Sequence, residues 1–472
     1  MTLLSEASFL VTPNGYKEDK LYAAIPTNGN GDMTVTRATT ATRVNEAGLV
    51  ELVPYNLLLR SEEFNTTWTL DGTGVGQSIT PNYATAPNGT NTAYRLQLNR
   101  TGGTYSRIQQ SVTGLTTSYS FSVYMKSNTG FSQNVGLRIK SIGANNVVTT
   151  FWQRFTFTGT TNDPSAQIIL YNLIAGTDVT ADILIWGAQL VEGSSALTYQ
   201  KTVDRLDIPR IDYTGGGCPS ILLEPQRTNL LLNSATVVTQ TRTTTAVANT
   251  LSFYGTGTIT LSGTFAGTLV GTGASNRVSL TFTPTAGSLV LTVSGSCTNG
   301  QLEAGAYPTS YIPTTTATVT RNADVLSRDN IYTNNLIVAG GGTWFVHLIN
   351  NTAFTADSST GAIYLDTSSL GYTNGLMLRK QTTGRIRLQT YVSTTSSFIY
   401  TTTTDTVKIL FKWNGATADV FVNGAKVVSA TLFPITNMQY LASNSAIYAL
   451  IKETMLFAKP LTEAQCIALT TL

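Results

Sequence analysis

Acidic side chains are the residues of this sequence whose type and spacing come nearest to catalytic chemistry. Four of them gather in the segment 201–228: Asp204, Asp207, Asp212 and Glu224. Two carboxyl groups about 5 to 10 Å apart are what glycoside hydrolysis requires. The same segment also holds Arg205, Arg210 and Arg227. We therefore expect salt bridges between these acids and arginines rather than a catalytic set.

Histidine and cysteine, the other residue types that often act in catalysis or bind metals, are few in this sequence. The one histidine, His347, lies between apolar neighbours in WFVHLI, so we expect a strand residue there, and a multi-histidine metal site is excluded. A Ser-His-Asp triad through His347 is disfavoured. The three cysteines are isolated and far apart, which predicts neither a disulfide framework nor a zinc motif. Cys466 is interpreted as a small buried apolar residue.

Glycine-rich stretches raise the question of a phosphate-binding loop. Gly340 to Gly342 and the segment GTGTITLSG neither lead into a helical pattern nor precede GKS or GKT. Such loops hold phosphate at the start of a helix. These glycines are therefore interpreted as turn and strand residues, and no cofactor is expected.

Composition narrows the class of protein. The 472 residues include 29 Lys and Arg against 26 Asp and Glu, and only 12% are charged, whereas an average soluble protein has about 25%. A nucleic-acid binder that works through a strong basic field is excluded. No apolar run reaches the roughly 20 residues that cross a bilayer, so no membrane insertion is expected. The start, MTLLSEASFL, lacks a secretory pattern, which predicts a reducing cytosol as the place of synthesis.

Hydrophobic alternation indicates strands almost everywhere. Residues 119–126 (YSFSVYMK) alternate, 182–190 (DILIWGAQL) are apolar on both faces, and the phenylalanines at 151, 155 and 157 share one parity. Short strands with Gly, Asn and Pro turns predict an all-β fold of sandwiches. Asn423-Gly424 predicts a hairpin turn. One helix is expected, at the C-terminus, where Thr462 and Gln465 form a capping box.

Two motifs occur twice and divide the chain. NLLLRS at 56–61 recurs as NLLLNS at 229–234, and Gln189-Leu190, Gly193 and Tyr199 recur 112 residues later. Glu192 and Glu303 follow the second motif and are expected at turn or edge-strand positions. Each module thus opens and closes with the same residues. The predicted domains are an N-terminal arm (1–55), a first jelly-roll module (56–200), a packed connector (201–228), a second, shorter module (229–320) and a C-terminal domain (321–472).

The arm is broken by turns and has little core of its own. We expect such a segment to be ordered by packing on something else, such as a partner or a sister chain. Only 12% of the residues are charged, so few charged side chains are available to block the edges of the sandwiches. Because open sheet edges pair with other chains, this composition predicts a homo-oligomer.

Long patches of the chain resemble virion structural proteins of tailed bacteriophages, of the tail-fibre or head-fibre type with carbohydrate-binding jelly-roll modules. These patches are PNGYKEDKLYAAIP and TRATTATRVNEAGLVE in the arm, RIDYTGGGCPSILLEPQRTNLL, QLEAGAYPTSYIPTTTATVTR and PLTEAQCIALT. The resemblance implies β-sandwich domains, assembly on a virion in the host bacterial cytoplasm, attachment to capsid or tail proteins through residues 1–55, and a homotrimer. In some members it implies binding to host or mucosal glycans.

The C-terminal stretch KILFKWNGATADVFVNGAKVV resembles the core hairpin of concanavalin A-like and laminin G-like lectin domains. Glycan binding then needs exposed aromatic rings flanked by amides, and Tyr372, with Asn374 beside it, and Trp413 are the candidates. Calcium, bound as in laminin G-like domains through Asp357, Asp366 or loop carbonyls, is a minor alternative, and no metal site is assigned.

The expected function is a non-enzymatic component of a phage virion that displays β-sandwiches for adhesion to a host surface or its glycans. Two alternatives stay open. One is a phage glycan depolymerase with a carboxylate pair, for which Asp204 and Glu224 are the first residues to mutate. The other is a capsid decoration protein without a ligand.

Overall fold

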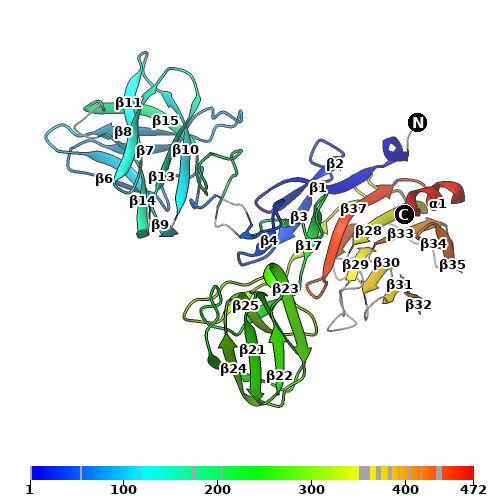
Figure 1. The fold of residues 1–472 in the computed structure, drawn as a ribbon. Coiled ribbons are helices and arrows are strands. Elements are labelled where there is room, and N and C mark those ends of the chain that lie inside the picture. The colour runs from blue at the N-terminus through cyan, green and yellow to red at the C-terminus, as the bar shows by residue number, and fades with distance from the viewer. Residues whose placement is uncertain are drawn as a thin grey trace. The chain divides into compact units, whose positions relative to one another are not determined.

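The computed structural model describes residues 3–472 except 54, 55, 116, 162, 173–176, 204, 205, 350–361, 368–373, 381–384, 393, 402–405, 416 and 432–437. The predicted all-β fold is confirmed. Antiparallel sheets make up nearly all of the regular structure in the described residues, and the one α-helix among them, α1 (Glu463–Thr470), lies at the C-terminal end (Figure 1).

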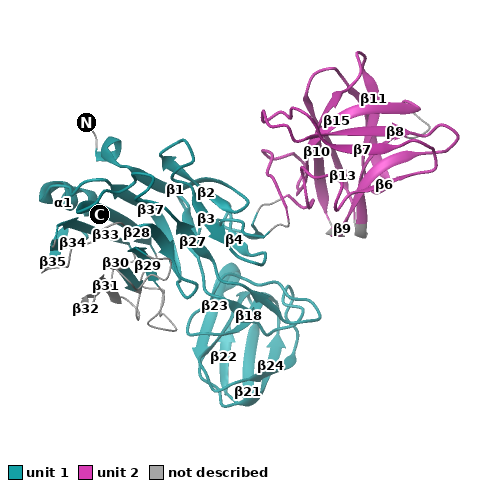
Figure 2. Cartoon of the chain, turned by 180° about the vertical axis from the view of Figure 1, so that it is seen from behind, with its two compact units in different colours: residues 1–53, 206–472 teal, residues 54–205 magenta. Residues whose placement is uncertain are grey.

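The chain forms two compact units (Figure 2). Residues 54–205, which include the first module, are unit 2. Residues 1–53 and 206–472 together are unit 1, so the arm, the connector, the second module and the C-terminal domain share one unit.

Unit 2 is a sandwich of two five-stranded sheets. One sheet has the order β13 (Gln153–Thr160), β10 (Ser118–Ser127), β15 (Thr180–Glu192), β8 (Ala93–Asn99), β7 (Ser78–Ala84). The other has the order β12 (Ile142–Val148), β11 (Gln133–Ile139), β14 (Asp163–Asn172), β9 (Ser106–Leu115), β6 (Thr69–Gly72). Alternating apolar residues such as Phe121, Val123 and Leu137 fill the space between the sheets.

The second module repeats this sandwich with fewer strands. Its sheets are β19 (Gln240–Thr244), β24 (Gly287–Ser294), β21 (Thr258–Gly263), β22 (Gly267–Val270), and β23 (Gly273–Phe282), β20 (Asn249–Gly255), β25 (Cys297–Ala304). The order of strands follows that of the first module, without counterparts of β6, β7 and β8. The shorter sequence of the second module therefore reflects missing strands.

The repeated sequence motifs close each sandwich. In the first module, the buried Asn56 side chain donates to the carbonyl of Ala188 (2.7 Å) and accepts from the amides of Leu58 (3.1 Å) and Leu190 (3.0 Å). One asparagine thereby ties the opening segment to the closing strand β15. The repeated Gln-Leu motif lies on that strand.

Asn229 does the same in the second module. Its side chain donates to the carbonyls of Gly300 (3.0 Å) and Ile312 (2.8 Å) and accepts from the amides of Leu231 and Leu302, both at 3.1 Å. A second pair of contacts repeats as well. Ser61 bonds the Tyr199 hydroxyl at 2.9 Å, and Ser234 bonds the Tyr311 hydroxyl at 2.7 Å. The two motifs therefore make the same set of contacts in both modules. We call this set the lock; it is formed by Asn56, Ser61 and Tyr199 in the first module and by Asn229, Ser234 and Tyr311 in the second.

The remaining strands of unit 1 centre on a 16-stranded sheet. Its order is β32 (Thr394–Thr401), β31 (Arg385–Val392), β30 (Asn374–Lys380), β29 (Ala362–Asp366), β36 (Tyr440–Ser443), β27 (Val325–Arg328), β3 (Met33–Thr36), β2 (Lys20–Ile25), β1 (Phe9–Lys17), β37 (Ala449–Phe457), β28 (Gly341–Ile349), β33 (Val407–Asn414), β34 (Thr417–Val422), β35 (Ala425–Thr431). The connector adds β17 (Ser220–Leu223), which pairs with β37 and with β16 (Ile211–Asp212). Short pieces outside this sheet are η1 (Leu3–Glu6), the pair β4 (Thr42–Val44) and β5 (Val50–Leu52), and the pair β18 (Arg227–Asn229) and β26 (Val319–Arg321).

The arm occupies the middle of this sheet. β1 pairs with β37, opposing Phe9 to Leu456, and β3 pairs with β27. Phe9, Val11 and Leu21 are buried in the same core as Trp344. The expectation that a partner or sister chain orders the arm is therefore corrected, because the arm packs into the core of its own unit.

Two local predictions are confirmed. Thr462 caps α1, its hydroxyl accepting from the Gln465 amide while the Gln465 side chain accepts from the Thr462 amide at 2.9 Å. Asn423 and Gly424 have φ values of 48° and 81° and form the turn between β34 and β35. Both features follow from chemistry within a few residues.

Candidate functional site

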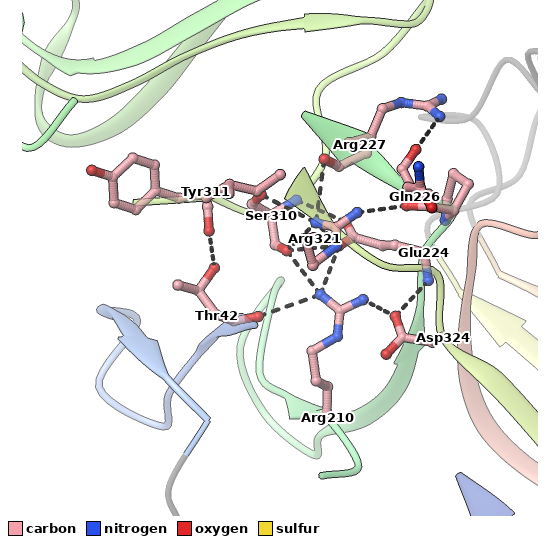
Figure 3. Close-up of polar contacts among 12 residues, drawn as sticks. Thr42, Arg210, Glu224, Gln226, Arg227, Ser310, Tyr311, Arg321 and Asp324 are labelled. Carbon is pink, nitrogen blue, oxygen red and sulfur yellow. Dashed lines mark hydrogen bonds and ion pairs between the residues drawn. The ribbon is translucent and has the colours of Figure 1, made fainter. Parts of the chain in front are cut away.

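Arg210 and Glu224 of the connector meet residues from two other segments in a buried ionic cluster (Figure 3). We call it the arginine–carboxylate cluster, and its members are Arg37, Arg210, Glu224, Arg321 and Asp324. Arg37 follows β3 of the arm, Arg210 and Glu224 flank the connector strands, and Arg321 ends β26. Its members come from positions 37 to 324, so no single stretch of sequence reveals it.

Glu224 is bound on both oxygens. Its Oε2 accepts from Arg210 Nη1 at 2.6 Å and from the Ser310 hydroxyl at 2.6 Å, and it forms an ion pair with Arg321 Nη1 at 2.7 Å. Its Oε1 accepts from the Ser310 amide at 2.7 Å. Ser310 belongs to the closing segment of the second module, so Glu224 ties that module to the connector.

Asp324 carries the rest of the cluster. Its Oδ1 accepts from Arg37 Nη1 at 2.6 Å, and its Oδ2 accepts from Arg210 Nη2 and from the Glu224 amide at 3.0 Å. Arg37 also donates to the Ile208 carbonyl at 2.9 Å. The arm, the connector and the start of the C-terminal domain are therefore joined at one buried carboxylate.

The cluster keeps its carboxylates charged. Burial alone would raise the pKa of Glu224, but the guanidinium groups of Arg321 and Arg210 lower it to about 2. For Asp324 as well, burial is outweighed by its arginine neighbours, first Arg210, and its pKa is lowered. A carboxylate held ionised in this way does not donate a proton near neutral pH. The cluster is thus suited to a structural role, in which it connects the arm, the connector and the start of the C-terminal domain.

The other acids of the connector are placed differently. Asp207 accepts from the Arg37 amide, and Asp212 accepts from the amides of Val44 and Thr214, both at 2.8 Å. Asp204 and Arg205 lie outside the described residues. Of the expected connector salt bridges, the structure brings together Arg210 and Glu224.

The two acids that follow the repeated motif, Glu192 and Glu303, lie in different environments. Glu303 is buried and accepts from the Thr309 amide (2.8 Å) and hydroxyl (2.6 Å), while burial raises the pKa of its carboxyl. The side chain of Arg227 lies 3.8 Å from it. Glu192 is exposed at the end of β15, where it accepts from the Thr117 hydroxyl at 3.1 Å.

The residues predicted to bind glycans do not form a site among the described residues. Tyr372 lies outside them, and Asn374 begins β30, where only its backbone is described. Trp413 on β33 is 1% exposed and belongs to the main core of unit 1. The prediction for Trp413 is corrected, because a buried ring offers no face to a sugar.

His347 and one of the two calcium candidates, Asp366, lie on strands, as the following distances and burial show. His347 lies on β28, with Nδ1 3.4 Å from Glu453 on β37. Asp366 is buried at the end of β29, and Asp357 lies outside the described residues. Within the described ranges no group of three His, Cys, Asp or Glu side chains is placed to hold a metal ion. No helix there is long and apolar enough to span a bilayer.

Two aromatic rings that the sequence analysis missed stand out at one end of the first module. Phe131, in the loop between β10 and β11, is 80% exposed, and Phe151, in the loop between β12 and β13, is 76% exposed. Contiguous exposed apolar patches often mark contact surfaces. We call Phe131 and Phe151 the aromatic loop pair.

The two loops are held next to each other by Ser127 at the end of β10. The Ser127 amide donates to the Thr149 carbonyl at 2.7 Å, and its hydroxyl donates to the Phe131 carbonyl at 2.6 Å. Gln133 Nε2 donates to the same hydroxyl at 2.7 Å. This network gives the rings fixed supports, so binding a ligand would cost little loop ordering.

The residue after Phe151 anchors its loop from the other side. Trp152 Nε1 donates to the Thr85 carbonyl at 3.1 Å, and the ring packs near Trp186 and Tyr124. Phe151 therefore projects from a fixed support. Asn128, Thr129 and Gln153 lie in or beside the same loops.

A sequence signal for this pair existed. Phe131 lies in SNTGFSQN, a turn-rich stretch with amides on both sides, which is the pattern expected of a binding loop. The shared parity of residues 151, 155 and 157 instead predicted one strand. β13 begins only at Gln153, which leaves Phe151 in the loop before it.

No family model matches the chain, and no curated protein matches it. Among solved structures, the chain is similar to the enzymatically active domain of tailspike protein 4 from bacteriophage CBA120, with 16% identity over 29% of this chain, a TM-score of 0.23 and 21% of that chain covered. This chain therefore spans about one fifth of the length of that tailspike domain.

Two further similar structures are complexes with carbohydrates. The IT-sialidase CBM40 of Ruminococcus gnavus, bound to α2,3-sialyllactose, has 11% identity over 29% of this chain and 84% of its own, with a TM-score of 0.23. Domain 4 of the GH43 arabinanase AbnA from Geobacillus stearothermophilus, in complex with arabinotriose, has 14% identity over 32% of this chain and 73% of its own, with a TM-score of 0.25. At these values the similarities assign neither a family nor a ligand to this chain.

Proposed function

We propose that the chain is a non-enzymatic structural component of a bacteriophage virion, a fibre or appendage of the head or tail, that adheres to glycans of the host surface. The observation that carries the adhesive part is the aromatic loop pair, Phe131 and Phe151, exposed at one end of a rigid sandwich. The virion part rests on the sequence patches that resemble phage structural proteins.

Ring chemistry favours a sugar as the ligand. The faces of pyranose rings carry C–H groups, which pack on aromatic rings, while their hydroxyl groups need amide and hydroxyl partners such as Asn128, Thr129 and Gln153. The chain as a whole has a net charge of only +3, so a neutral glycan is a better match than a strongly charged one.

The carboxylates support a role without catalysis. Glu224 and Asp324 have their oxygens occupied by arginines and backbone amides and lie buried in the joint of unit 1. Glycoside hydrolysis needs one protonated carboxyl group and access to the substrate. This pair supplies neither.

Attachment to the particle is proposed to use the arm outside its buried strands. β1, β2 and β3 are committed to the sheet of unit 1, whereas the turn between β4 and β5 exposes Leu49 (60%). Other virion proteins would then contact the turns of residues 1–55, and the assembled protein would be located on the virion.

Glycan-array binding of the full chain tests the adhesive function. We expect Phe131→Ala and Phe151→Ala each to weaken binding about tenfold, since a stacked aromatic contact contributes on the order of 1.4 kcal/mol. Ile142→Ala is the control, because Ile142 is an exposed apolar residue at the opposite turn of the β11–β12 hairpin.

Three results would overturn the proposal. Equal binding by the wild type and both Phe variants would remove the aromatic loop pair, and absence of binding to every glycan would favour an inert decoration protein. Steady release of reducing sugar from host polysaccharide by the wild type would favour a depolymerase.

A further inference from the structure

The outer face of the larger sheet of the second module differs from every other sheet surface described above. This sheet consists of β19, β24, β21 and β22, and Figure 1 labels the last three of these strands. Its outward side chains are Thr241, Thr243, Thr258, Thr260, Ser262, Thr268, Val270, Ser288, Val290, Thr292 and Ser294. All of them are threonine, serine or valine, so the outward positions of these four described strands carry neither a charge nor an aromatic ring.

Strand register shows that these residues form continuous rows. Thr268 on β22 opposes Thr260 on β21, which in turn opposes Thr292 on β24, and all three are exposed. The row beside it consists of Ser262, Val290 and Thr241 across three strands. The face is therefore a continuous array of small β-branched and hydroxyl side chains.

The first module provides an internal comparison, because the same sheet is built twice. Gln110 on β9 and Gln240 on β19 both accept from the amide of the fourth residue of the opening motif, Leu59 at 2.7 Å and Leu232 at 2.9 Å. β9 and β19 are therefore equivalent. Their sheets can be compared strand by strand.

On the equivalent face of the first module, charges are present. Arg107 pairs with Asp71 at 2.7 Å, and Arg138 lies over the Tyr171 ring at 5.0 Å. In the second module, Arg277 is the only charged residue between positions 243 and 302. It lies on the other sheet and donates to Ser252 and Thr309.

The free edge of this sheet also lacks charged residues and prolines. β22 (Gly267–Val270) is the last strand of the order and contains no charge and no proline. Proteins normally block such edges with charges, prolines or bulges, because an open edge pairs with another chain. At the opposite edge, Arg242 on β19 lies on the inward side with Leu289, which is one of these protective devices.

We propose that this outer sheet, with the β22 edge, is where the chain binds a second copy of itself. A charged face placed against its own copy repels it, whereas an uncharged face is compatible with itself. The absence of aromatic rings argues against a sugar as the occupant.

The size of the face sets the expected strength. Four strands about 4.8 Å apart and about six residues long, at about 3.4 Å per residue, cover roughly 400 Å² in projection. A standard stable interface buries about 800 Å² per partner. The sheet alone therefore predicts association that depends on concentration.

Analytical ultracentrifugation of the full chain tests this surface. We expect the wild type to form an assembly larger than the monomer at micromolar concentration, and the double variant Thr260→Lys/Thr268→Lys to raise the dissociation constant at least about tenfold. The matched control, Ser111→Lys/Thr113→Lys, places two lysines on β9 of the first module, where both residues are exposed and point outward. This control should associate as the wild type does.

A charge-swap experiment separates an interface from misfolding. Thr260→Glu/Thr268→Glu alone should also dissociate, while a mixture of the lysine and glutamate variants should associate again. A monomeric wild type, an unchanged lysine variant or a mixture that stays monomeric would each overturn the proposal. Because all these residues lie outside the aromatic loop pair, the outcome is independent of glycan binding.

Discussion

At the scale of single residues, the arginine–carboxylate cluster is the most consequential feature of unit 1. Three guanidinium groups and two carboxylates are buried together, and every carboxylate oxygen has a described partner. Removing one member of a buried ion pair leaves an uncompensated charge, which is usually more damaging than replacing the whole group. Stability should therefore be sensitive to any single member.

Glu224→Gln is expected to lower the free energy of unfolding of unit 1 by about 3–5 kcal/mol at pH 7, because Arg210 and Arg321 lose their shared carboxylate. Chemical denaturation of the full chain measures this. Glu463→Gln is the control, since the Glu463 side chain is 56% exposed. Its effect should stay within about 0.5 kcal/mol.

The difference in the free energy of unfolding between the wild type and Glu224→Gln should decrease as the pH falls. The pKa of Glu224 is about 2 in the folded chain against an ordinary value of 4.5, so between these values the unfolded chain binds a proton that the folded chain does not. The Glu224 contribution is thus complete above about pH 4.5 and is lost as the pH falls toward 2. The gap between wild type and Glu224→Gln should narrow over that window. A constant gap would contradict the assignment. Glu303, whose pKa is shifted the other way, is present in both proteins and cancels.

At the scale of elements, the same lock connects the opening segment to the closing strand in both modules. Asn56 and Asn229 each satisfy backbone groups of the opening segment and of the closing strand. A buried backbone group left without a partner costs about 1–3 kcal/mol. The lock therefore contributes far more than one ordinary side-chain hydrogen bond.

Asn56→Ala and Asn229→Ala should each destabilise their own module by several kcal/mol, because each leaves more than one buried group unsatisfied. Hydrogen exchange followed by mass spectrometry resolves the two modules. Protection should fall around β15 in the first variant and around β25 in the second. Asn88→Ala, in an exposed turn where the side chain accepts from Thr90, is the control. Equal loss of protection in both modules from one substitution would contradict the idea of two separate locks.

At the scale of the whole molecule, the arm is the element that holds unit 1 together. β1 to β3 lie between β27 and β37 in the order of the 16-stranded sheet. Their residues Phe9, Val11 and Leu21 share a core with Trp344. Without the arm, the sheet would be divided and part of its core exposed to water.

Deleting residues 1–36 should therefore unfold the C-terminal domain while leaving the first module folded, since residues 54–205 form a separate compact unit. Limited proteolysis of the truncated and full chains measures this. Rapid cleavage within 325–457 and persistence of a fragment covering about 56–200 are expected. Retention of a protease-resistant C-terminal domain would show that the arm is dispensable for folding.

Local chemistry was readable from the sequence. The period-2 alternation predicted β structure because it places apolar residues on one face of a strand, and Thr462 with Gln465 predicted the cap of α1 because the capping box acts within one helical turn. Asn423-Gly424 predicted its hairpin for the same reason. The repeated motifs also identified the residues that proved to form the two locks.

Features that depend on where distant segments meet were not readable. Phe9 pairs with Leu456, and Arg37 meets Asp324, only because the whole sheet of unit 1 brings residues hundreds of positions apart together. The boundary of one strand, β13, decided that Phe151 is exposed, and the packing of the core decided that Trp413 is buried. Composition and short-range periodicity were sufficient to predict the class of structure, its repeats and its low charge. Tertiary structure alone decided which charges pair, which rings reach solvent and which sheet face is left without charge, because burial and long-range register arise from packing over the whole unit.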